Sequence, residues 1–129
     1  MKRRGILNDA LSGALARLGH TDMVVVADCG LPRPAGVTVV DLAVVSGVPT
    51  FTQVIAALAE EIVVERVTIA HQTEAANPNA HALIVDHFGQ PDVIPHDELK
   101  EHSAHAVLVI RTGEATPYAN AILHCGVPF

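Results

Sequence analysis

The chain has 129 residues, of which 50% are hydrophobic and 17% are charged, and its formal net charge is −6 at pH 7. This length is typical of one domain and this composition can build a core, so we expect a single domain over residues 1–129 and exclude a disordered chain. Nucleic-acid binding is also excluded, because it needs clustered basic and stacking aromatic side chains, whereas aromatic residues make up 3% of the chain and Lys2-Arg3-Arg4 is its only basic run.

The N-terminal part predicts one helix and one strand. Asn8 is a good N-cap, and apolar residues recur behind it at helical spacing as far as Gly19, which predicts a helix over Asn8–Leu18. Met23–Ala27 is a short, continuous apolar run, which is typical of a strand buried on both faces. A loop rich in Gly and Pro follows it.

Helices and strands alternate along the rest of the chain. Thr50 is a plausible N-cap, and Asn77-Pro78 places a proline at the first position of a helix that Gly89 ends. In chain order the predicted elements are a strand over Val37–Val45, a helix from about Phe51 to Glu61, a strand over Val67–Ala70, a helix through Phe88, a short Val93-Ile94 segment, a helix over His96–Ser103, and strands over Ala106–Ile110 and Ala121–Leu123. This alternation predicts a single-domain α/β fold with a mainly parallel sheet flanked by helices.

The sequence does not indicate secretion or membrane insertion. An apolar stretch should follow the basic N-terminus of a signal peptide, but Asn8, Asp9 and Ser12 interrupt it. No apolar run approaches the roughly 20 residues that cross a bilayer. Cys29 and Cys125 lie far apart and outside any C-x-x-C pair, and in a reducing compartment two such cysteines are more often buried small hydrophobic residues than a disulfide. We therefore expect a soluble, cytoplasmic protein without a membrane partner.

Candidate chemistry comes from polar residues near the ends of the predicted strands, where open α/β sheets bind ligands. No nucleotide-binding motif is present, and the spacing of the 8 histidines does not form a metal site, so we expect no metal. Two parts of the chain stand out: Gly19-His20-Thr21-Asp22, which leads into Asp28-Cys29-Gly30-Leu31-Pro32, and Gly113–Asn120, which places the only Tyr of the chain beside an Asn. From the residues alone, the simpler explanations are preferred: His20 caps a helix end, and Tyr118-Ala119-Asn120 forms a turn.

Four motifs in order change that preference. They are Leu18-Gly19-His20-Thr21-Asp22, Asp28-Cys29-Gly30-Leu31-Pro32, Gly47-Val48-Pro49-Thr50-Phe51 and Gly113-Glu114-Ala115-Thr116-Pro117-Tyr118-Ala119-Asn120. Together they resemble the ribose pyranase/fucose mutarotase family over essentially the whole chain, as far as Gly126-Val127-Pro128-Phe129. The second and third motifs are similar to the ribose pyranase branch of that family.

The resemblance implies a reaction, a site and an assembly. The reaction interconverts the pyranose and furanose forms of D-ribose, without a cofactor. The resemblance makes His20 the catalytic acid and implies substrate contacts at Asp28, His96, Tyr118, Ala119 and Asn120. It also implies a ring-shaped homo-oligomer, a decamer, with its sites near subunit contacts.

The chemistry of the residues agrees with this reaction. Ring opening and closure require a group that gives and takes protons near neutral pH, and histidine has a reference pKa near 6.5. Two alternatives remain: a mutarotase for a related sugar such as fucose, and a non-enzymatic sugar-binding accessory protein. The second alternative leaves His20 without a role.

Overall fold

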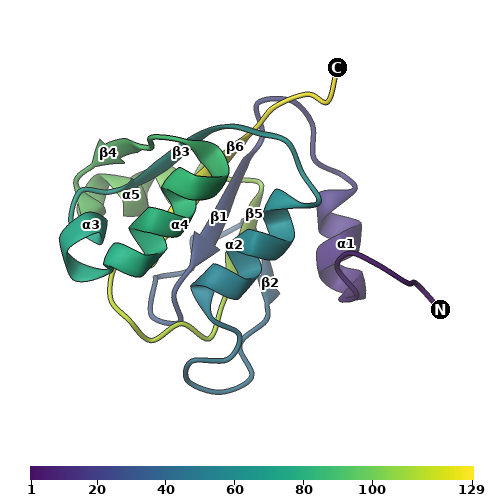
Figure 1. Cartoon of the computed structure of the whole chain (residues 1–129), viewed down its shortest axis with the longest axis horizontal. Helices are drawn as coiled ribbons and strands as arrows, with labels where there is room; N and C mark the ends of the chain where they lie inside the picture. Colours follow the sequence, from purple (N-terminus) through teal and green to yellow (C-terminus); the bar gives the residue numbers. More distant parts are fainter.

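A six-stranded sheet forms the centre of the computed structural model, which describes all residues 1–129 (Figure 1). Its strands lie in the order β2-β5-β1-β6-β3-β4. The strands are β1 (Met23–Ala27), β2 (Thr38–Asp41), β3 (Val64–Ala70), β4 (Asp92–Ile94), β5 (Leu108–Arg111) and β6 (Ala121–Cys125). The helices are α1 (Asp9–Leu15), α2 (Phe51–Ala59), α3 (Thr73–Ala76), α4 (Pro78–Phe88) and α5 (His96–Ser103), and none of them is long and apolar enough to cross a membrane.

Helices cover both faces of the sheet. The larger core lies on the face covered by α1, α2 and α4, where Val24 and Val26 of β1 pack in one cluster with Ile55 of α2 (Figure 1). Val25 of β1 points to the other face, where it packs in a second cluster with Leu99 of α5. The apolar run of β1 is continuous because both of its faces are buried.

Most of the predicted helices are confirmed, because their end signals act locally. Asn8 accepts a hydrogen bond from the backbone N–H of Leu11 (2.8 Å), and Thr50 forms a capping box with Gln53. The first helix ends at Leu15 rather than Leu18, since the chain tightens there into turns with bonds between residues three apart. The short helix α3 was not predicted.

The prediction of an α/β fold with a mainly parallel sheet flanked by helices is confirmed. β1 and β2 both run parallel to β5, and β3 runs parallel to β4. β6 runs antiparallel to both of its neighbours, β1 and β3. Its direction is reversed because residues 112–120, which join β5 to β6, contain no helix that would carry the chain back to the other end of the sheet.

The segment 112–120 crosses the C-terminal end of β1. Both the backbone N–H and the hydroxyl of Thr112 donate to the carbonyl of Ala27, at 2.9 and 2.8 Å. The N–H of Cys29 donates to the carbonyl of Glu114 at 2.9 Å. This crossing brings the residues that precede β6 beside those that follow β1.

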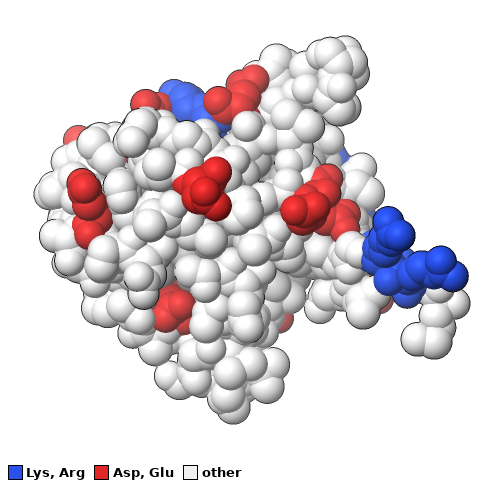
Figure 2. All heavy atoms as spheres, viewed as in Figure 1, with Lys and Arg blue, Asp and Glu red and all other residues white.

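Charge is unevenly distributed on the face shown in Figure 2. The largest group of basic side chains lies on the N-terminal segment, which carries Lys2, Arg3 and Arg4, and acidic side chains are scattered over the rest of this face.

Candidate functional site

A pocket of about 390 Å³ lies where the C-terminal ends of β1 and β4 meet the segment 112–120. Three predicted site residues, Asp28, His96 and Tyr118, line it. The other lining residues are Gly30, Leu31, Pro32, Lys100 and Pro117. The pocket therefore stands at the edge of the sheet where ligands of α/β proteins bind.

Asp28 is the first residue after β1, and its orientation is fixed from two sides. Its Oδ1 accepts a hydrogen bond from the N–H of Gly30 (2.9 Å), and its Oδ2 accepts one from Nδ2 of Asn120 (2.8 Å). The N–H of Asp28 donates in turn to Oδ1 of Asn120 (2.9 Å). A carboxylate has about four lone-pair sites, so capacity remains on Asp28 for hydroxyl groups of a ligand.

Solvent exposure differs among three consecutive predicted site residues, Tyr118, Ala119 and Asn120. Ala119 and Asn120 are buried, with exposed fractions of 0% and 1%, and they lie behind the lining residues rather than among them. Tyr118 takes a left-handed conformation with φ of 62°, which is uncommon outside glycine. The hydroxyl of the buried Thr73 donates to its carbonyl (2.9 Å) and helps to hold this conformation.

His96 and Lys100 come from successive turns of α5. The rings of His96 and Tyr118 pack edge to face, with centroids 5.1 Å apart and planes at 85°. Nδ1 of His96 is buried without a hydrogen-bond partner, so this ring has unused capacity beside the pocket. Nζ of Lys100 lies 2.8 Å from Oδ1 of Asp97, and this hydrogen bond and charge lower the pKa of Asp97 below its usual value. Sequence reasoning missed Lys100, although its spacing of four from His96 places both on one helix face.

Glu114 anchors the segment that leads to Tyr118. Its Oε2 accepts from the N–H of Phe51, the first residue of α2, and its Oε1 accepts from the N–H groups of Ala115 and Thr116, all at 3.1 Å. Burial opposes the ionisation of Glu114, but these backbone donors outweigh it and lower its pKa. The segment is therefore fixed to α2.

His20 does not lie in this pocket. It belongs to the turn before β1, whereas Asp28 follows β1, and a five-residue strand spans roughly 15 Å. Nε2 of His20 lies 3.2 Å from Oε2 of Glu65, near the start of β3, and both side chains are about half exposed. Within one chain the structure thus brings together five of the six predicted site residues and leaves His20 apart.

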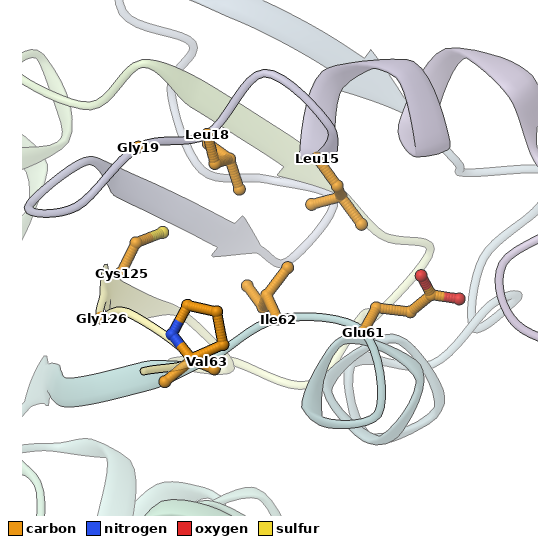
Figure 3. Close-up of a pocket in the computed structure, with 9 residues that line it drawn as sticks. Leu15, Leu18, Gly19, Glu61, Ile62, Val63, Cys125 and Gly126 are labelled. Atoms are coloured by element: carbon orange, nitrogen blue, oxygen red, sulfur yellow. The ribbon is translucent and has the colours of Figure 1, made fainter.

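A second pocket, of about 200 Å³, adjoins the turn that carries His20 (Figure 3). Figure 3 shows Leu15, Leu18 and Ile62 pointing toward one another across it. Glu61 supplies the one carboxylate that lines this pocket, and it already accepts a hydrogen bond from the N–H of Ile6 (2.7 Å). Burial raises the pKa of the Cys125 thiol, which also lines it. A pocket with these mostly apolar walls does not suit a polyol.

The sequence matches the model of the RbsD / FucU transport protein family over residues 1–128. The chain belongs to this family. Members of the RbsD / FucU family that resemble it include D-ribose pyranase 1 of Rubrobacter xylanophilus, which is 56% identical, and D-ribose pyranase 2 of Streptomyces griseus, which is 53% identical. Both matches extend over 129 residues and cover 100% of each chain. The family predicted from the four motifs is confirmed.

Comparison with solved structures agrees with this fold. Bacillus subtilis RbsD in complex with D-ribose superposes with a TM-score of 0.94 at 46% identity, with 100% of both chains covered. The fucose mutarotase of Streptococcus pneumoniae in complex with L-fucose gives a TM-score of 0.78 at 20% identity, covering 95% of both chains. The second likeness shows a shared fold.

Proposed function

We propose that this protein interconverts the pyranose and furanose forms of D-ribose, the reaction of a D-ribose pyranase. The observation that carries the proposal is the full-length likeness to an RbsD structure in complex with D-ribose, at 46% identity and a TM-score of 0.94. The likeness to a fucose mutarotase, at 20% identity, is more distant, which favours ribose over fucose.

The reaction needs proton transfer at two oxygens. A base takes the proton of the anomeric hydroxyl while the bond from C1 to the ring oxygen breaks, and an acid gives a proton to that oxygen. The open-chain aldehyde then closes when another hydroxyl adds to C1, with the reverse proton movements. The protons balance over the cycle, so one histidine that both gives and takes a proton meets the requirement.

The pocket supplies groups that suit a sugar with several hydroxyls. In this proposal Asp28 accepts hydrogen bonds from hydroxyls, and His96 and Tyr118 both donate and accept. Asn120 holds Asp28 through their two mutual hydrogen bonds, and it retains one amide N–H for the sugar. Ala119 would contribute backbone atoms only, because its side chain is buried.

The proposed proton-transfer residue is His20, supplied to the pocket by a second copy of the chain. The support is its position at the opposite end of β1 from Asp28. Further support is the exposure of apolar side chains that an assembly would cover, among them Leu7 (73%), Val44 (76%) and Val45 (62%). The assembly proposed is a homo-oligomer, of which a ring-shaped decamer is the form that the family resemblance implies.

A cytoplasmic location belongs to the same proposal. Cys29 and Cys125 are both free thiols, which suits a reducing compartment.

Saturation-transfer NMR on D-ribose tests the activity. Catalytic amounts of the protein should accelerate exchange between pyranose and furanose signals, and acceleration should be weaker with L-fucose. A sugar-binding accessory protein would bind ribose without accelerating exchange, and that result would overturn the proposal.

Mixing two impaired variants, assayed at ribose concentrations well below saturation, tests the shared site. His20→Ala and Asp28→Ala chains, unfolded and refolded together, should recover part of the activity, because some interfaces then combine an intact His20 with an intact Asp28. Refolding each variant alone is the control. No recovery in mixed oligomers of the expected size would place His20 outside the site.

A further inference from the structure

His20 and Glu65 form a pair across a long separation in sequence. Nε2 of His20 and Oε2 of Glu65 are 3.2 Å apart, although the residues are 45 positions apart in the chain. An exposed pair of this kind often contributes little to stability. Here, however, three features of the surrounding structure hold the two side chains in position.

The turn that carries His20 is held from both sides. Oδ2 of Asp22 accepts a hydrogen bond from the N–H of Gly19 (2.7 Å), which closes the turn. The N–H of Thr21 donates to the carbonyl of Cys125 (3.0 Å), and the N–H of Cys125 donates to the carbonyl of Asp22 (2.9 Å). The turn is therefore fixed to the end of β6, which lies between β1 and β3 in the sheet.

Glu65 occupies an irregular position in β3. Val64 pairs with Cys125 of β6, and Arg66 pairs with His124, so the register shifts and Glu65 is an extra residue without a partner in β6. Such bulges change the direction of a side chain and occur often beside active sites. Here the bulged residue is the one whose carboxylate meets His20.

The residues next to Glu65 do not compete with His20 for its carboxylate. A Cβ atom on Gly126 would lie 3.2 Å from Cβ of Glu65, which is a tight contact, and 3.5 Å from its Oε2, so the glycine leaves room beside the Glu65 side chain. The nearby cation, Arg66, is directed elsewhere: its guanidinium contacts Oδ2 of Asp92 (3.5 Å) and Nδ1 of His124 (3.1 Å).

We propose that Glu65 is the positioning residue for His20. Its carboxylate accepts the Nε2–H of the neutral imidazole, which fixes the ring orientation and leaves Nδ1 as the nitrogen that takes the sugar proton. Once Nδ1 is protonated, the same carboxylate stabilises the imidazolium until that proton is returned to the sugar. A carboxylate that orients a histidine in this way is a general device of acid–base catalysis. The inference rests on the proposed role of His20 in proton transfer.

Long-range ¹H–¹⁵N spectra test the tautomer directly, on the wild-type oligomer at a pH where the ring is neutral. The His20→Ala spectrum identifies the His20 signals by their absence. We expect Nε2 to be protonated and Nδ1 to be unprotonated. A ring protonated at Nδ1 would overturn the proposal, whatever the activity.

Ribose exchange rates as a function of ribose concentration provide the second test. Glu65→Ala should lower kcat by about threefold to tenfold, the effect of one lost hydrogen bond, with KM nearly unchanged. Glu65→Gln keeps the side-chain volume and one acceptor oxygen, so its kcat should fall less. The double variant His20→Ala/Glu65→Ala should be no slower than His20→Ala, because Glu65 acts through His20. If the double variant is slower than His20→Ala by the full factor that Glu65→Ala alone causes, Glu65 does not act through His20.

Matched controls separate the possible failures. Glu60→Ala, at an exposed position that ends α2, should exchange ribose at the wild-type rate. If His20→Ala is as fast as wild type, the proposed role of His20 fails. If His20→Ala is slow and Glu65→Ala is as fast as wild type, only the positioning role of Glu65 is overturned. If Glu65→Ala does not fold or assemble, the positioning role is tested by the kcat of Glu65→Gln and by the tautomer of His20 in the wild-type protein.

Discussion

Asp28 and Asn120, 92 residues apart in the chain, hold each other through two hydrogen bonds. The N–H of Asp28 donates to Oδ1 of Asn120 at 2.9 Å, and Nδ2 of Asn120 donates to Oδ2 of Asp28 at 2.8 Å. The side chain that faces the pocket is thus oriented by one that is 1% exposed. We therefore expect Asn120 to affect both ligand binding and stability.

Asn120→Ala should raise the ribose concentration for half-maximal exchange and also lower the free energy of unfolding, by about 1–3 kcal/mol, because it leaves the partly buried N–H of Asp28 unpaired. Saturating exchange should fall much less than in His20→Ala, since the hydroxyls that Asp28 binds do not change charge as the ring opens. Ribose saturation and chemical denaturation on one preparation measure both effects. Asn79→Ala, at an exposed position in α4, is the control. Unchanged affinity in a folded Asn120→Ala variant would remove Asn120 from the site.

His20→Ala should lower the rate of exchange between ribopyranose and ribofuranose by at least about tenfold, which is below the usual contribution of an acid–base group. His20 is half exposed and outside the core, so the variant should keep its melting temperature. His105→Ala, another exposed histidine, should exchange at the wild-type rate. A folded, assembled His20→Ala protein with full activity would rule out His20 as the catalyst.

Thr73→Val should loosen the Tyr118 backbone. The variant retains the side-chain volume but removes the hydroxyl that donates to the carbonyl of Tyr118 at 2.9 Å. One buried hydrogen bond contributes about 1 kcal/mol, so the melting temperature should fall by about 3–5 °C, and ribose affinity should fall with it. Thr38→Val, at an exposed position at the start of β2, should change neither. Stability loss without any change in affinity would show that the Tyr118 conformation is not needed for binding.

Glu114 should make stability depend on acid pH. The pKa of Glu114 lies below its ordinary value of 4.5, because backbone donors outweigh the effect of burial. The unfolded chain therefore takes up this proton first, and the stabilisation is present above about pH 4.5 and is lost as pH falls through the lower, folded pKa. The difference in unfolding free energy between wild type and Glu114→Gln should be largest near neutral pH and shrink below pH 4.5. A difference that stays constant with pH would contradict the assignment.

Metal ions should not affect the exchange reaction. No group of three or more His, Cys, Asp or Glu side chains is arranged to hold an ion. Dialysis against a strong chelator, followed by elemental analysis and the exchange assay, should leave the activity unchanged. If the activity is lost on dialysis and is restored by zinc or manganese, the exchange reaction depends on a metal ion.

Local signals in the sequence were sufficient for most of the fold, whereas the site depends on contacts that no local pattern contains. Asn8 and Thr50 cap their helices through neighbours three residues away, so the sequence predicts both starts. The direction of β6 follows from the crossing of residues 112–120 over β1, which is a tertiary event. The pairing of Asp28 with Asn120 depends on the same crossing.

The family motifs supplied the names of the site residues but not their arrangement. The predicted strand over Met23–Ala27 already separated His20 from Asp28, but no motif indicated how residues at opposite ends of a strand could serve one site. Thr73 was missed because its partner is a backbone carbonyl 45 residues away. Lys100 had a visible signal, its helical spacing from His96, and Glu65 had none before the register of β3 was known.

The central position of β6 has a consequence for the order in which the chain can fold. β6 is the only strand that joins β2-β5-β1 to β3-β4, and it is the last strand in the chain. During synthesis the two halves of the sheet emerge first and have no hydrogen bonds to each other until residues 121–125 leave the ribosome. The same step brings Asn120 to Asp28, so the pair that orients Asp28 in the pocket can form only after residues 120–125 have been synthesised.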